Sequence, residues 1–82
     1  TGGVIMDTRI AEVTFHIDEA TSQEERESLR NILLAMDGVV AAAYHDEKPH
    51  LMLIEYMPEK LDSLVFVEAA KKNGLHAELI GL

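Results

Sequence analysis

The sequence predicts an α+β domain whose elements follow the order strand, helix, strand, strand, helix, strand. Residues 9–18 alternate apolar and polar side chains, which is typical of a half-buried strand. Residues 22–37 and 59–73 place apolar side chains at helical spacing, and a glycine follows each stretch. Short apolar stretches indicate the remaining strands at 39–45, 50–57 and 75–81.

The first crossover has clear start and stop signals. Thr21 and Ser22 each precede a glutamate by three residues, Glu24 and Glu25, and either pair can form a capping box. Gly38 then supplies the left-handed residue that ends a helix. We therefore expect a capped helix directly after the first strand.

The second half of the chain carries similar signals for the ends of its elements. Residues 46–49 form a turn between two strands, and Pro58 ends the second of these strands. The second helix is expected to bury one side and to end at Gly74. The apolar residues expected on that side are Leu61, Leu64, Val65 and Ala69.

Chain topology follows from the handedness of crossovers. Two interlocked strand–helix–strand units give a ferredoxin-like βαββαβ fold, with a four-stranded antiparallel sheet ordered 4-1-3-2. Both helices lie on one face of this sheet. We expect a single domain over residues 1–82, with Thr1–Ile5 as a non-native addition and Met6 as the native start.

The other face of the predicted sheet has no cover within the chain. Strand alternation places small and apolar residues there, more than a solvated face needs. This patch indicates a homodimer or a docking site for another protein, with the dimer favoured because symmetric pairs dominate soluble oligomers. Its members are Leu51, Leu53, Ala41, Ala43 and Ile80.

Composition narrows the possible functions. Fifteen acidic residues against seven basic ones give a net charge of −8, which argues against binding nucleic acid. No apolar stretch is long enough to span a membrane and no signal peptide is visible, so we expect a cytoplasmic protein. The chain has no cysteine, and it lacks the phosphate-binding and hydrolase motifs, so we predict that it is not an enzyme.

Three segments resemble the heavy-metal-associated domain, the module of copper chaperones and metal-transport ATPases. They are residues 37–39 (Asp-Gly-Val), 54–58 (Ile-Glu-Tyr-Met-Pro) and 68–79. The last segment contains Gly74-Leu75-His76-Ala77 near its end. The resemblance covers about residues 9–82 and implies metal binding or trafficking. Ser22 and Glu25 stand where that family has its two metal-binding cysteines. A serine hydroxyl does not replace a thiolate for copper(I), so we interpret these two residues as helix caps.

The four histidines offer a different set of ligands. The topology places all of them at one end of the sheet, the end that holds the metal loop in the resembling family. We expect His16 and His76 to form one pair, with Asp18 or Glu78 as a further ligand. His45 and His50 are expected to form a second, separate pair or a site between two subunits. Imidazoles and carboxylates suit zinc, nickel, cobalt or copper(II).

Two functions therefore remain open from the sequence. The first is a small metal-binding or metal-trafficking protein that uses histidine and carboxylate ligands in place of thiolates. The second is a non-metal assembly or docking module that works through the uncovered sheet face. Ordinary surface histidines are the alternative to the metal site, because the ends of strands commonly carry polar residues.

Overall fold

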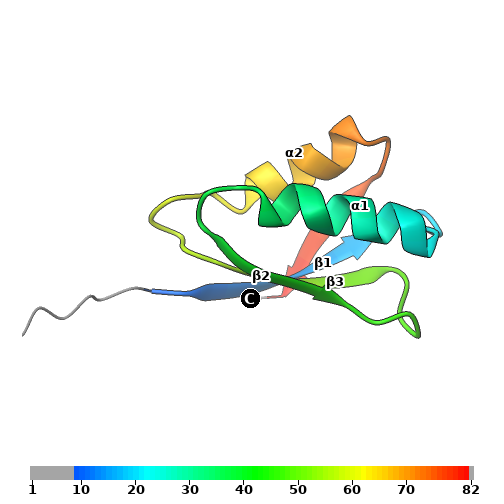
Figure 1. The fold of residues 1–82 in the computed structure, drawn as a ribbon, viewed down its shortest axis with the longest axis horizontal. Helices are drawn as coiled ribbons and strands as arrows, with labels where there is room; N and C mark the ends of the chain where they lie inside the picture. Colours follow the sequence, from blue (N-terminus) through cyan, green and yellow to red (C-terminus); the bar gives the residue numbers. More distant parts are fainter. Residues whose placement is uncertain (1–8, 82) are drawn as a thin grey trace, which may run out of the picture.

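The computed structural model describes residues 9–81 and confirms the predicted architecture. The sheet order is β2-β3-β1-β4 with antiparallel neighbours, and both helices lie on one side of the sheet (Figure 1). The proposed addition at Thr1–Ile5 lies outside the described residues. The elements are β1 (Ala11–Ile17), α1 (Gln23–Leu34), β2 (Val39–Tyr44), β3 (Leu51–Tyr56), α2 (Leu64–Lys72) and β4 (Ala77–Gly81).

The core lies between the sheet and the two helices. In β1, Val13, Phe15 and Ile17 are buried, as their alternation predicts. Phe66 of α2 is fully buried, and its ring meets that of Tyr56 edge-on with centroids 5.1 Å apart. Burial of one side of the sheet leaves the alternate side chains on the uncovered face.

The start of α1 is the capping box that the sequence predicts at Ser22. Ser22 Oγ accepts a hydrogen bond from the Glu25 backbone N–H at 3.1 Å, and Glu25 Oε1 accepts one from the Ser22 N–H at 2.9 Å. Thr21 is not the cap. Its hydroxyl is buried and donates instead to the Pro49 carbonyl at 3.1 Å.

Replacing Ser22 with alanine should lower the free energy of unfolding by about 0.5–2 kcal/mol, because the Glu25 N–H at the helix start loses its acceptor. Urea denaturation of the two proteins measures the change. Ser28→Ala, at an exposed position inside α1, is the matched control and should leave stability unchanged or raise it slightly, because alanine is the better helix former. Equal effects of the two substitutions would contradict a capping role for Ser22.

The second helix starts later than predicted, at Leu64 instead of residue 59. Asp62 Oδ1 accepts a hydrogen bond from the Leu64 N–H at 2.9 Å, a local turn that competes with helix formation. The shift changes which side is buried. Leu64 is 62% exposed, contrary to the prediction, and Phe66 takes the central position in the core.

The sheet has one face that the helices leave uncovered and an open edge at β2. Leu53 and Ile80 are 40% and 53% exposed on the face opposite the helices.

A bulge at Val40 interrupts the register of β2 against β3. On the outer edge of β2, Arg30 Nε donates a hydrogen bond to the Ala42 carbonyl at 2.7 Å. Within residues 9–81, no helix is long and apolar enough to cross a membrane.

Candidate functional site

His16 is the central histidine at the end of the sheet where β1 and β2 finish. We call this the site end. It lies near the end of β1, where its register partners are Leu51 on one side and Glu78 on the other. Its Nδ1 atom is 3.4 Å from Asp18 Oδ1, and its side chain is 38% exposed. His16 therefore has a carboxylate beside it and stays accessible from solvent.

His50 packs against His16. The two imidazole rings stack with centroids 5.7 Å apart and planes 18° apart. His50 Nδ1 lies 2.7 Å from the Ile17 carbonyl oxygen, which only accepts hydrogen bonds, so Nδ1 is the protonated nitrogen. In the neutral ring this leaves the lone pair on Nε2, the arrangement that orients histidine ligands in metal sites.

This contact corrects the expectation of two separate histidine pairs. The sheet order makes β1 and β3 direct neighbours, so the residue before β3 meets the end of β1. The Ile17 N–H also donates to the His50 carbonyl at 2.8 Å, which fixes the backbone at this point. His50 consequently belongs with His16 instead of with His45.

His76 pairs with a residue that the sequence analysis did not select. Its Nδ1 lies 2.6 Å from Glu19 Oε2, and its backbone N–H donates to Glu19 Oε1 at 2.7 Å. This hydrogen bond raises the pKa of His76 and lowers the pKa of Glu19. We expected His76 to pair with His16. In the structure His76 is instead bonded to Glu19, on the loop between β1 and α1.

The His76–Glu19 pair should make stability depend on pH. A raised imidazole pKa stabilises the fold fully below about pH 6.5, and this contribution is lost as pH rises through the folded pKa of His76. A lowered carboxyl pKa contributes above about pH 4.5 and is lost as pH falls through the folded pKa of Glu19. The gap in stability between wild type and Glu19→Gln should be widest between these values, as measured by urea denaturation across pH.

A control variant distinguishes the loss of the His76–Glu19 hydrogen bond from the general effect of removing a carboxylate. Glu24→Gln removes an exposed carboxylate from the first turn of α1 and should show no such maximum in its pH profile. An NMR titration of the His76 ring should show a lower His76 pKa in Glu19→Gln than in wild type. An unchanged His76 pKa in that variant would contradict the pairing.

The remaining predicted ligands are Glu78 and His45. Glu78 is exposed on β4, directly opposite His16. His45 is exposed after β2, and among residues 9–81 its side chain makes no hydrogen bond or ion pair. Over the same described range, no group of three or more histidines and carboxylates stands in a position ready to hold a metal ion.

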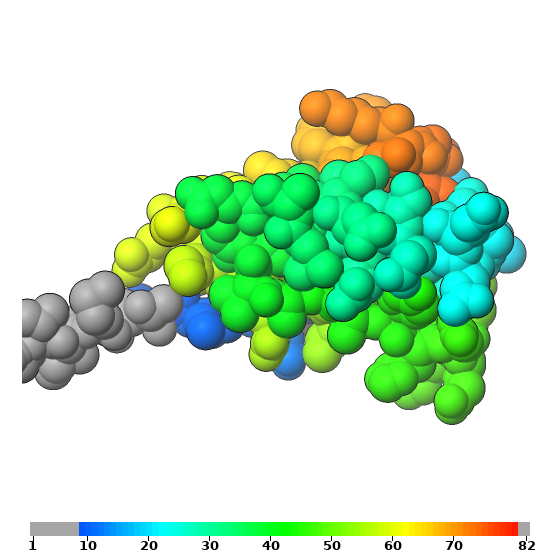
Figure 2. Space-filling model, in the orientation of Figure 1, coloured from blue at the N-terminus to red at the C-terminus, as the bar shows by residue number. Residues whose placement is uncertain are grey.

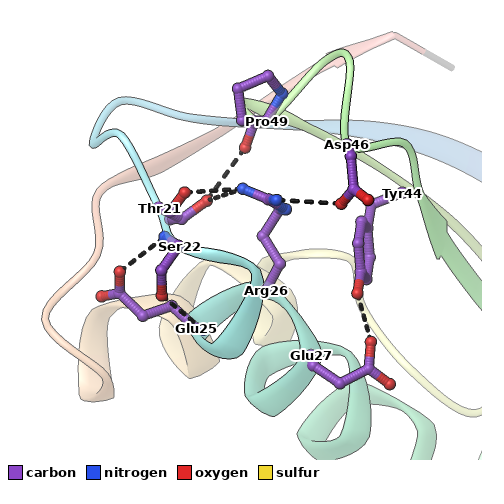
Figure 3. A network of polar contacts seen from close by, with 8 residues as sticks. All are labelled: Thr21, Ser22, Glu25, Arg26, Glu27, Tyr44, Asp46 and Pro49. Atoms are coloured by element: carbon purple, nitrogen blue, oxygen red, sulfur yellow. Dashed lines mark hydrogen bonds and ion pairs between the residues drawn. The ribbon is translucent and has the colours of Figure 1, made fainter.

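The buried guanidinium of Arg26 joins the two loops of the site end (Figure 3). Its NH1 atom donates to the Thr21 carbonyl at 2.7 Å, and its NH2 atom donates to Asp46 Oδ1 at 3.1 Å. Its charge also lies over the Tyr44 ring, 5.4 Å from the centroid. Arg26 thereby ties the loop before α1 to the hairpin turn that carries His50.

The space-filling view shows the result of these contacts. The residues leading into α1 (cyan) lie directly against the turn between β2 and β3 (green) in Figure 2. Ser22 and Glu25, which the sequence analysis placed where the resembling family has its cysteines, lie at the start of α1 and are exposed. They bond to each other as a helix cap, and a hydroxyl and a carboxylate do not suit copper(I).

Comparisons with solved structures support the architecture. Oxidized MerP from Ralstonia metallidurans CH34 superimposes with a TM-score of 0.77 and 13% identity, over 87% of this chain and 97% of that one. A copper binding domain from HMA7, a P-type ATPase, gives 0.76 and 16%, over 85% and 93%. The HMA domain of a copper chaperone for superoxide dismutase, in its apo form, gives 0.71 and 22%, over 90% and 70%.

No protein-family model and no curated protein sequence matches the chain. The structural likeness at these low identities establishes the fold, which this chain shares with HMA domains. The resemblance read from the sequence segments is therefore confirmed at the level of the fold.

Proposed function

We propose that this domain binds a divalent transition metal ion at a site centred on His16. The observation that carries the proposal is the stacked His16–His50 pair, in which the Ile17 carbonyl orients His50 with Nε2 free. Asp18, 3.4 Å from His16, and Glu78, its register partner, are the carboxylates in reach. This set of nitrogen and oxygen ligands suits zinc, nickel, cobalt or copper(II).

The site forms around the ion by side-chain movement, because no three of these ligands stand ready to hold a metal ion within residues 9–81. His76 and His45 stay outside the proposed set, because Glu19 holds His76 and the His45 side chain makes no hydrogen bond or ion pair within residues 9–81. As part of this proposal, the protein binds the ion without catalysing a reaction, and it does so in the cytoplasm. The negative charge of the chain, −8, favours a cation at this exposed site.

Metal titration tests the proposal. Zinc, nickel, cobalt and copper(II), added to protein first treated with EDTA, should raise the thermal midpoint. An ion at a hundredfold its dissociation constant adds ~2.7 kcal/mol to the native state. The double variant His16→Asn/His50→Asn, which keeps a donor for the Ile17 carbonyl, should lose this stabilisation. His45→Asn is the matched control and should retain it.

The affinity should also fade at acidic pH, because imidazole binds metals only when neutral. Calorimetric titration at pH 7.5 and 5.5 measures this loss. Equal and weak binding by wild type and the double variant would leave His16 and His50 as ordinary surface residues.

A second candidate function is docking of a protein partner through the uncovered sheet face. The favouring observation is the exposure of Leu53 and Ile80 on a face that no described element covers. The predicted patch of Leu51, Leu53, Ala41, Ala43 and Ile80 lies on that face by strand alternation. A homodimer and a different protein are the two partners that the sequence left open.

A further inference from the structure

The uncovered sheet face carries charge of one sign. The four strands contain three glutamates and no lysine or arginine. Glu12, Glu55 and Glu78 each lie between residues that are buried or packed on the core, so their side chains belong to the face opposite the helices. The sheet therefore presents carboxylates without a cation of its own.

Two of these carboxylates stand opposite each other. Glu12 of β1 and Glu55 of β3 are register partners, and Cβ atoms of such pairs lie ~4.5–5.5 Å apart. Like charges in this position are destabilising in the free protein. An arrangement with this cost points to a cation that comes from another molecule.

The apolar part of the face adjoins this pair. The next register row joins Ala43, Leu53 and Thr14, and Leu53 is 40% exposed there. A groove of about 290 Å³ runs beside Leu51 and Leu53 toward the hairpin turn. Lys48, the cation that lines this groove, lies in that turn, at the opposite end from the glutamate pair.

A second copy of the chain matches this face poorly. Each copy would bring the same three carboxylates into the shared interface, and each carries a net charge of −8. Burying carboxylates without partners is costly, whereas a complementary charge improves both association rate and specificity. The charge pattern thus favours a different molecule over self-pairing.

We propose that the uncovered sheet face docks a protein segment with an apolar stripe flanked by lysines or arginines, in the form of an amphipathic helix. This inference rests on the second candidate function and names its partner class. The stripe packs on Leu53 and Ala43, and the cationic heads pair with Glu12 and Glu55. A helix in this place covers the open face and completes a three-layer arrangement.

Two synthetic helices of 18 residues serve as probes. One is built from leucine, alanine and lysine with lysines flanking the leucine stripe, and the other replaces every lysine with glutamate. Titration followed by ¹H–¹⁵N NMR should shift amides of Glu12, Leu53 and Glu55 with the lysine helix, and binding should weaken as salt increases. Glu12→Gln/Glu55→Gln should weaken binding at least fivefold.

The matched control is Glu59→Gln/Glu68→Gln, which removes the same charge from exposed positions away from this face and should change affinity less than twofold. Equal losses in both double variants, or binding of the glutamate helix as tightly as the lysine helix, would overturn the partner class while leaving docking intact. Binding of neither helix would overturn docking itself. Dimer formation by the chain alone at neutral pH, abolished by Leu53→Glu, would assign the face to a second copy.

Discussion

Arg26→Ala is expected to lower the free energy of unfolding by about 2–4 kcal/mol, a large share of the ~4–12 kcal/mol expected for a domain of this size. The arginine side chain is only 7% exposed and makes charge-assisted hydrogen bonds to the two loops that it joins. Its removal leaves the Thr21 carbonyl without this donor and opens a gap beside the Tyr44 ring. Urea denaturation measures the loss.

The control is Lys60→Ala, which removes an ion pair to Asp37 between side chains that are 49% and 89% exposed. Exposed pairs of this kind contribute at most ~1 kcal/mol. Arg26→Lys should recover little of the lost stability, because lysine cannot reproduce the planar fork that reaches both loops. A loss no greater than that of Lys60→Ala would show that the network in Figure 3 contributes little.

Gly38→Ala should lower the free energy of unfolding by about 2–5 kcal/mol, more than Gly74→Ala. Gly38 has φ of +109°, which costs an L-residue ~1–2 kcal/mol. An added Cβ would also lie 2.9 Å from Lys60 Cβ, a position held by the backbone, and such overpacking adds ~1–3 kcal/mol. The turn after α1 would have to move away from residues 60 and 61.

Gly74 provides the matched comparison for this prediction. It also has positive φ, +77°, but an added Cβ would meet nothing within 4 Å. Gly74→Ala should therefore cost only the conformational part, ~1–2 kcal/mol. Equal losses for Gly38→Ala and Gly74→Ala, measured by urea denaturation, would show that the close approach at Lys60 is relieved at no cost.

The fold could be predicted because its signals are local and repeated. Alternation in β1 and positive-φ glycines after both helices each correspond to a physical requirement that the structure confirms. The start of α2 could not be predicted in the same way, since helical spacing continues through residues 59–63. The Asp62 side chain decides that start by bonding the Leu64 N–H, a competition that periodicity does not show.

The site was predictable only in its location. Topology correctly brought the histidines to one end of the sheet and made β1 and β3 neighbours, but it does not show which ring meets which partner. Local contacts decide that, as the His16–His50 stack and the Glu19–His76 bond show. Arg26 did leave a signal in the sequence. It stands three residues before Leu29 and seven before Leu33, on the buried stripe of α1, where an arginine must find internal partners.

The hydrogen bond from Arg30 to the edge of β2 has a consequence for solution behaviour. β2 (Val39–Tyr44) holds two valines, three alanines and a tyrosine, with no charge or proline to deter another strand from joining it. By occupying the Ala42 carbonyl, the guanidinium removes an acceptor that an incoming strand would use, and the bulge at Val40 disrupts the template further along. Together they reduce the number of regularly spaced backbone groups that this open edge offers to a strand of another molecule.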